Sequence, residues 1–200
     1  MADDKNIERY SKETQLIYGK AHSKKWDYDH HVVPPMTTSA TYRLDSAQRG
    51  AQGFVEFAHT TEETKNKQPI LIYDRLGEPN KDILEENLAY AEGGECALTF
   101  GCGMAAISAV LGVLTKSGDD IIAHRTMYGC TYSLFTNWYP RYNISVQLLN
   151  LHDLDMVASA IKPETRVMYF ESPVNPTLTL IDIGSITELV KKVNSMRPEE

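Results

Sequence analysis

Residues 100–114 read FGCGMAAISAVLGVL, two glycines around a cysteine followed by an unbroken apolar helix pattern. Glycine permits both a sharp turn and the close approach of another molecule to the backbone, here at Gly101 and Gly103. The first N–H groups of a helix have no partner within that helix, so the turn can bind an anion such as a phosphate group. A tight strand-to-helix turn, in which the glycines serve geometry alone, is the alternative interpretation.

Short apolar runs alternate with helical patterns on both sides of this turn. The expected strands are 97–100, 120–124, 144–149 and 166–172, and the expected helices between and after them are 104–115, 131–138, 153–161 and 183–194. Strands that are apolar throughout are typical of a parallel sheet that helices cover on both faces. The predicted fold class is therefore α/β, with three α/β/α layers and a mostly parallel sheet.

The chain changes character before residue 80. Residues 1–70 are polar and show no sustained period, so they are expected to form an extended N-terminal arm. The run KDILEENLAYAE from Lys81 is helical in pattern, and Gly93 and Gly94 are expected to end that helix. We predict an arm over 1–70 and the first part of a compact large domain over 71–200.

Composition excludes several classes of protein. The chain has 200 residues, a net charge of −7 and 42% hydrophobic residues, which argues for a globular protein without a nucleic-acid or anionic-membrane surface. The first residues contain no apolar leader and no run is long enough to span a bilayer, so a cytoplasmic location is expected. Three cysteines without metal-ligand spacing predict reduced thiols and no metal site.

Ligands of parallel α/β sheets bind beyond the carboxyl ends of the strands. The segments that follow the predicted strands there are residues 101–103, 124–130 and 172–175. We expect these three segments to converge on one cleft.

Four motifs in order carry a resemblance to a known family. They are YDRLGEPN (73–80), LEENLAYAEGGECALTFGCGMAAISAVL (84–111), MYGCTYSLF (127–135) and YFESPVNPTLTLIDI (169–183). Together they resemble the Cys/Met-metabolism family of pyridoxal-phosphate enzymes, which includes methionine γ-lyases, cystathionine γ-synthases and cystathionine lyases. The resemblance covers roughly residues 30 to 194, with a longer insertion around 50 to 70. It implies the large-domain fold of pyridoxal-phosphate-dependent transferases, pyridoxal 5'-phosphate as cofactor, and an oligomerisation role for the arm.

The resemblance assigns the cofactor phosphate to the glycine turn. The backbone N–H groups of Gly103 and Met104 are the implied donors, and Cys102 stands where the family usually has Ser. Tyr73 and Arg75 match a Tyr-x-Arg motif that reaches across a subunit boundary to the neighbouring phosphate. This crossing implies at least a homodimer, and relatives are commonly tetramers built as dimers of dimers.

The remaining matches surround the cofactor ring. Tyr128 matches a tyrosine that stacks on the pyridine ring and takes part in proton transfer, and a hydroxyl suits this role if nearby charge lowers its pKa. Asn175 matches the amide that hydrogen-bonds the cofactor's phenolic oxygen. Glu171 matches a buried acidic residue at the end of the strand. Cys130 resembles methionine γ-lyases, whereas many relatives carry Gly, so it favours methionine as substrate; a buried structural thiol is the alternative.

Two parts of this chemistry do not occur in the 200 residues. The family's cofactor-binding Lys, in a Ser-x-Thr-Lys turn, and its pyridine-nitrogen Asp, in an Asp-Asn-Thr strand end, are both missing from the sequence. We therefore expect the chain to correspond to the N-terminal half of a longer protein and to be inactive alone. The implied activity of the longer protein is γ-elimination of methionine to methanethiol, 2-oxobutanoate and ammonia. Cystathionine γ-synthase, cystathionine lyase, O-acylhomoserine sulfhydrylase and a non-catalytic fragment are the alternatives.

Overall fold

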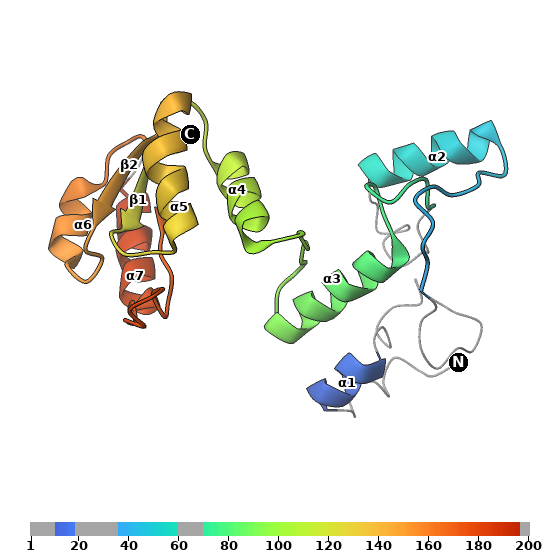
Figure 1. Ribbon diagram of the computed structural model, residues 1–200, viewed down its shortest axis with the longest axis horizontal. Coiled ribbons are helices and arrows are strands. Elements are labelled where there is room, and N and C mark those ends of the chain that lie inside the picture. Colours follow the sequence, from blue (N-terminus) through green and yellow to red (C-terminus); the bar gives the residue numbers. More distant parts are fainter. Residues whose placement is uncertain (1–10, 19–35, 60–69, 197–200) are drawn as a thin grey trace. The chain divides into compact units, whose positions relative to one another are not determined.

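The structure is a computed structural model that describes residues 11–18, 36–59 and 70–196 (Figure 1). The chain divides into two compact units, residues 1–99 and residues 100–200. The domain boundary expected between residues 70 and 71 stays a prediction, and much of the expected arm lies outside the described residues. Among the described residues, no helix is long and apolar enough to cross a bilayer, and no cluster of acidic, His and Cys side chains is arranged to hold a metal ion.

The described part of the first unit is helical. It contains α1 (Lys12–Tyr18), α2 (Ala47–Ala58) and α3 (Pro79–Glu92). The Glu78 side chain caps α3 by accepting the Lys81 N–H at 2.7 Å, and Gly93 ends the helix in the left-handed conformation with φ of 70°. The predicted helix and its glycine stop are therefore confirmed.

Helix α2 corrects the prediction that the segment before residue 70 is irregular. Ser46 caps it by accepting the Arg49 N–H at 3.1 Å. Gly50 and Gly53 weaken the helical signal in the sequence because glycine has a poor helix propensity. Packing explains both glycines, since a Cβ on Gly50 would lie 2.7 Å from the Leu44 side chain and one on Gly53 would lie 2.9 Å from another neighbouring side chain.

The second unit alternates strands and helices. In chain order its elements are α4 (Gly103–Leu114), β1 (Asp120–His124), α5 (Gly129–Ser133), the π-helix η3 (Leu134–Trp138), the 3-10 helix η4 (Tyr139–Tyr142), β2 (Ser145–Leu149), α6 (Leu154–Ala160), β3 (Thr165–Tyr169) and α7 (Ile183–Asn194). All four helices predicted after residue 103 are present, although the second continues into a π-turn and a 3-10 turn.

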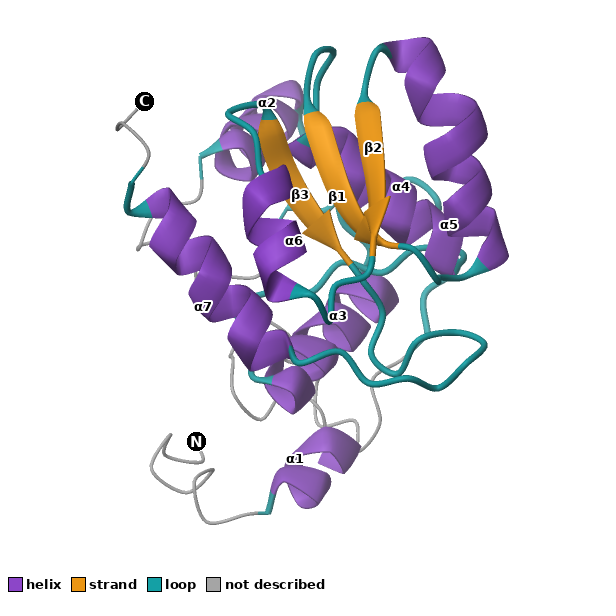
Figure 2. Cartoon of the chain, turned by 90° about the vertical axis from the view of Figure 1, so that its left-hand side faces the viewer, coloured by secondary structure: helices purple, strands orange, loops and turns teal. Residues whose placement is uncertain are grey.

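The three strands form a parallel sheet in the order β2-β1-β3. Helices cover both faces, with α4 and α5 on one side and α6 and α7 on the other (Figure 2). Strand β1 is buried throughout, and its alternate side chains supply two cores: Ile121 faces Leu111 of α4 and Phe135 of η3, whereas Ile122 faces Val157 of α6. The three-layer α/β/α fold predicted from the sequence is thus present.

The strand predicted at 97–100 is not formed in the described chain. Leu98 and Phe100 are exposed there, and the Thr99 N–H and hydroxyl both donate to the Glu85 carboxylate, at 2.7 and 2.9 Å. A strand needs a neighbouring strand for its backbone groups, and an apolar run alone cannot supply one. The prediction of four strands is therefore wrong for the described residues.

Candidate active site

The glycine turn leads directly into α4. Cys102 is the N-cap residue, its side chain makes no capping hydrogen bond, and its carbonyl accepts the Ala105 N–H at 3.1 Å. Among the described residues no acceptor is found for the N–H groups of Gly103 and Met104. A Cβ placed on Gly101 or Gly103 would meet no atom within 4 Å. Packing within residues 11–18, 36–59 and 70–196 therefore does not require these glycines.

Tyr128 immediately precedes α5, beyond the carboxyl end of β1. Its side chain is 43% exposed, and its hydroxyl oxygen accepts a hydrogen bond from the Cys130 thiol at 3.4 Å. This thiol, and more weakly Cys102, raises the pKa of Tyr128 above its ordinary value. The shift is opposite to the lowering that the sequence-based hypothesis required, because thiols rather than cations surround the hydroxyl.

A single carboxylate joins the segments that follow β1 and β3. The Glu171 Oε1 atom accepts the Tyr128 N–H at 2.9 Å and the Tyr169 hydroxyl at 3.4 Å, while Oε2 accepts the Asn175 N–H at 3.2 Å. The predicted neighbours Tyr128 and Asn175 are thus held by the same side chain. Glu171 is half-buried, not fully buried as the family resemblance implied.

The first turns of α4 and α5 are also in contact. The buried Thr131 hydroxyl donates to the Met104 sulfur at 3.6 Å, and Thr131 also lies close to the Tyr169 hydroxyl. Burial raises the pKa of Tyr169, so this phenol remains a neutral hydrogen-bonding group. Neither Thr131 nor Tyr169 was predicted as a site residue. Their positions just beyond β1 and at the last residue of β3 were the available signal.

The loop that carries Asn175 is folded upon itself. Val174 is fully buried, its N–H donates to the Thr179 carbonyl at 2.8 Å, and the Ser172 hydroxyl oxygen accepts the Ile181 N–H at 3.1 Å. Asn175 itself is exposed. The loop therefore fixes the backbone of Asn175, while Asn175 itself stays accessible.

His124 ends β1 next to these segments and is almost fully buried. Its Nδ1 atom accepts the Leu151 N–H at 3.2 Å, which requires the neutral ring. Burial, and then the nearby His152 and Arg125, lower the pKa of His124 below its ordinary value. This histidine holds the segment after β2 in place and was not predicted as a site residue.

Tyr73 and Arg75 lie in the first unit and contact each other. The Arg75 Nε donates to the Tyr73 hydroxyl at 3.1 Å, and the guanidinium carbon lies 5.2 Å from the centre of the Tyr73 ring. This hydrogen bond raises the pKa of Arg75, so the group stays cationic. The other predicted site residues all belong to the second unit.

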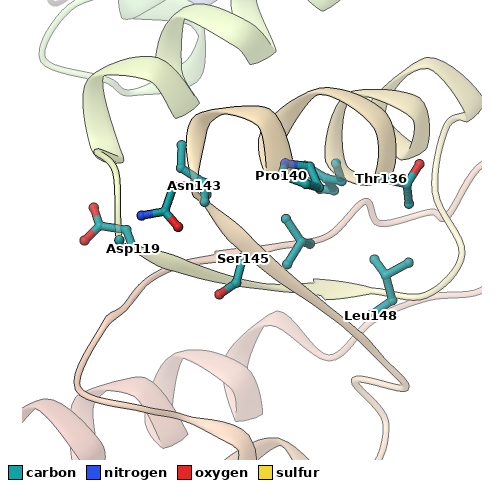
Figure 3. A pocket seen from close by; sticks show the side chains of 10 residues that line it. Asp119, Thr136, Pro140, Asn143, Ser145 and Leu148 are labelled. Carbon is teal, nitrogen blue, oxygen red and sulfur yellow. The ribbon is translucent and has the colours of Figure 1, made fainter.

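A cavity of about 670 Å³ lies elsewhere in the second unit, beside β2 and the π and 3-10 turns (Figure 3). Phe135, Pro140, Asn143 and Val146 are among its lining residues, and no predicted site residue lines it. Glu171 joins the segments that contain Tyr128 and Asn175, but this described cavity is not the cleft that was expected from the predicted segments.

The sequence profile of Cys/Met metabolism PLP-dependent enzymes matches residues 13–197. This chain belongs to that family. The L-methionine gamma-lyase of Porphyromonas gingivalis is 35% identical over 166 residues, which are 83% of this chain and 39% of that enzyme. The chloroplastic cystathionine beta-lyase of Mimosa pudica is 44% identical over 117 residues, 58% of this chain and 25% of that enzyme. The chain therefore spans about two fifths of the length of the first of these relatives.

Solved structures of the family share the fold. A Campylobacter jejuni protein assigned as O-acetylhomoserine (thiol)-lyase superposes with a TM-score of 0.75 and 27% sequence identity, covering 92% of this chain and 42% of that one. That structure contains N'-pyridoxyl-lysine-5'-monophosphate, and pyridoxal 5'-phosphate is the cofactor of the Cys/Met metabolism family.

The glycine turn fits the phosphate group of this cofactor. The N–H groups of Gly103 and Met104, which have no acceptor in the described part of the chain, start a helix of 12 residues, and a side chain at Gly103 would meet no described atom within 4 Å. Backbone N–H groups and the positive end of the helix dipole are suited to a phosphate dianion.

Proposed function

We propose that the whole protein is a pyridoxal-phosphate-dependent carbon–sulfur lyase that converts L-methionine to methanethiol, 2-oxobutanoate and ammonia by γ-elimination. The carrying observation is the hydrogen bond at 3.4 Å between the Cys130 thiol and the Tyr128 hydroxyl. It brings the residue that favours methionine to the group proposed to handle the leaving sulfur. The similarity to proteins named L-methionine gamma-lyase supports the same substrate.

The residues of this chain have separate proposed tasks around the cofactor. Pyridoxal phosphate, when bound, supplies an electron sink for the carbanion chemistry. The N–H groups of Gly103 and Met104 bind its phosphate, with Cys102 beside them at the helix cap. The Asn175 amide donates to its phenolic oxygen, and Glu171 positions both Asn175 and Tyr128 through their backbone N–H groups.

Tyr128 is proposed to pack against the cofactor ring and to give a proton to the departing thiolate. The Cys130 thiol raises the pKa of Tyr128, so in this chain the phenol carries its proton at neutral pH but is a weaker acid than an ordinary phenol. The proposed proton transfer therefore requires that charge brought by the bound cofactor and substrate lowers this pKa. The exposed side chain leaves room for a ring above it.

Tyr73 and Arg75 are proposed to serve the phosphate of a neighbouring subunit. Their mutual hydrogen bond fixes the forked guanidinium, which suits bidentate phosphate recognition. We accordingly propose a homo-oligomer, a dimer of dimers, and a cytoplasmic enzyme. Gel filtration with light scattering measures the molar mass of the assembly. The natural protein and Arg75→Ala should have the same tetrameric mass if the assembly does not depend on the contact of Arg75 with the phosphate.

Product analysis of the whole protein tests the reaction. Incubation with L-methionine should release methanethiol and 2-oxobutanoate in equal amounts, and Tyr128→Phe should lower kcat by about 10²-fold or more without abolishing cofactor binding. Cys130→Gly should lower kcat/KM for methionine more than for cystathionine. Absence of methanethiol from methionine would exclude the proposed reaction.

A second candidate is turnover of cystathionine or an O-acylated homoserine. The likeness to a cystathionine beta-lyase and to a protein assigned as O-acetylhomoserine (thiol)-lyase favours it. Parallel assays with cystathionine, and with O-acetylhomoserine plus sulfide, separate these activities from methionine cleavage. The 200-residue chain contains neither the Ser-x-Thr-Lys nor the Asp-Asn-Thr motif, so we propose that it is inactive alone. Turnover of methionine by this chain would contradict that proposal.

A further inference from the structure

Two accessible thiols lie on the first turns of two touching helices. Cys102 is the N-cap of α4 and Cys130 is the second residue of α5, and both are exposed. The Thr131–Met104 contact at 3.6 Å joins these same turns, because Met104 lies two residues after Cys102 and Thr131 directly follows Cys130.

The Tyr128 hydroxyl accepts a hydrogen bond from the Cys130 thiol at 3.4 Å. Cys102 is the weakest of the causes that raise the pKa of the same hydroxyl, after Cys130, which agrees with its place on the neighbouring first turn. The Cys102 side chain makes no capping hydrogen bond, and a thiol–hydroxyl hydrogen bond such as that of Cys130 is weak. Among the described residues, the hydrogen bonds of the two sulfurs are therefore limited to this weak one of Cys130.

We propose that Cys102 and Cys130 form a redox-responsive dithiol pair, which a small-molecule disulfide oxidises to an intramolecular disulfide. One cysteine thiolate attacks the small disulfide, forms a mixed disulfide and releases the first small thiol. The second cysteine thiolate then attacks the protein sulfur of that mixed disulfide and releases the second small thiol. The two cysteines lose two electrons and two protons in total, and both are recovered in the two small thiols.

Oxidation would alter the candidate site in two places. A disulfide joins Cα atoms about 4–7 Å apart, so it draws the first turns of α4 and α5 together. It removes the Cys130 thiol proton from the Tyr128 hydroxyl and places a sulfur bridge beside the N–H groups of Gly103 and Met104. The pair therefore closes the phosphate site when oxidised, a consequence that rests on the proposed function of that site.

Peptide mass mapping of the 200-residue chain tests the pair directly. The reduced chain is incubated with oxidised glutathione, the remaining thiols are alkylated, and the chain is digested without reduction. We expect a linked peptide that contains Cys102 and Cys130, while Cys96 carries glutathione or the alkyl group. Separate glutathione adducts on Cys102 and Cys130, or a disulfide between two chains, would overturn the proposal.

Single substitutions supply the matched controls. Cys96→Ser should leave the linked peptide unchanged, whereas Cys130→Ser should leave Cys102 with a glutathione adduct only. Formation of the same amount of intramolecular disulfide by another pair in Cys130→Ser would show that accessibility alone decides the pairing, and would overturn the specific assignment.

Cofactor binding is measured separately by fluorescence titration with pyridoxal phosphate. The oxidised chain should bind at least about tenfold more weakly than the reduced chain, and reduction should restore binding. Equal affinity in both states would overturn closure of the site. A reduced chain that binds no pyridoxal phosphate would instead count against phosphate binding at the start of α4 in this chain, while the disulfide is judged by the peptide masses alone.

Discussion

The Glu171 carboxylate accepts the Tyr128 N–H at 2.9 Å across 43 residues of sequence. The same carboxylate holds the Asn175 N–H, so two loops that leave different strands share one acceptor. Charged acceptors make stronger hydrogen bonds than neutral ones. A half-buried carboxylate with three donors therefore holds both loops firmly in place.

Glu171→Gln should loosen both loops. The amide keeps one acceptor oxygen but turns N–H groups toward the remaining donors, so the free energy of unfolding should fall by about 1–3 kcal/mol. Hydrogen exchange of the Tyr128 and Asn175 amides should become faster, and mass spectrometry of the exchanged peptides measures it. Glu188→Gln on the exposed face of α7 is the matched control. Unchanged protection at Tyr128 would contradict the role of Glu171.

Asp120→Asn should destabilise the sheet from its amino end. Asp120 is 1% exposed and accepts hydrogen bonds from Ser145, Gln147 and Thr165, at 2.5, 2.8 and 2.9 Å, with Lys162 at 3.5 Å. Loss of the charged acceptor should cost about 2–3 kcal/mol in urea unfolding followed by circular dichroism.

The same carboxylate predicts a low-pH limit. Burial alone would raise the pKa of Asp120, but the three hydrogen bonds and Lys162 outweigh it and lower the pKa below its usual 3.8. The contribution of Asp120 to stability is therefore present above pH 3.8 and is lost as the pH falls through the lowered pKa.

The control for Asp120→Asn is Asp155→Asn, at an exposed position of α6, which should change the free energy of unfolding by less than about 0.5 kcal/mol. An equal loss of unfolding free energy in Asp120→Asn and Asp155→Asn would contradict the stabilising role of the hydrogen bonds that Asp120 accepts.

His124 should make the fold sensitive to mild acid. Burial and the neighbouring His152 and Arg125 lower its pKa in the folded state, so the unfolded chain binds the proton more readily. Stability contributed by the neutral ring is present above pH 6.5, the ordinary value, and declines as the pH falls toward the lowered pKa. His124→Asn should flatten the dependence of the unfolding free energy on pH between about pH 5 and 7. The exposed His152, changed to Asn, should leave this pH dependence largely in place.

The sequence predicts those elements whose signal is local. Helix α7 begins and ends at Ile183 and Asn194 as expected, and β1 occupies the predicted 120–124, because caps and apolar runs mark both. Helix α2 was missed because tertiary contacts, not propensity, require Gly50 and Gly53. The strand expected at 97–100 failed because pairing depends on a neighbour that an apolar run does not reveal.

The site residues also divide into those that the local sequence marks and those that depend on tertiary contacts. Glu171 joins Tyr128 to Asn175, and the Thr131–Met104 contact joins the residues that directly follow two of the predicted segments. The convergence of all three segments on one cleft stays a prediction. The opposite pKa shift of Tyr128 could not be predicted, because it depends on the thiol of Cys130 lying 3.4 Å from the hydroxyl. The roles of these residues toward the cofactor stay predictions.

Gly103→Ala should separate binding from folding. The new methyl group meets no protein atom within 4 Å, so the free energy of unfolding should be unchanged or raised by up to about 1 kcal/mol. Affinity for pyridoxal phosphate should nevertheless fall by about tenfold, because the methyl group occupies the approach to the two N–H groups. Gly112→Ala, also open and on the same helix, should leave the affinity unchanged. Equal affinities for Gly103→Ala and Gly112→Ala would contradict this use of the glycine turn.

The most direct test is to follow the backbone amide signals of Gly103 and Met104 by NMR while the chain is titrated with pyridoxal phosphate and, separately, with pyridoxal. We predict that both amides shift on adding pyridoxal phosphate and that pyridoxal, which lacks the phosphate, leaves them nearly unchanged. Binding of pyridoxal phosphate without movement of either amide would contradict the assignment of the phosphate to the start of α4.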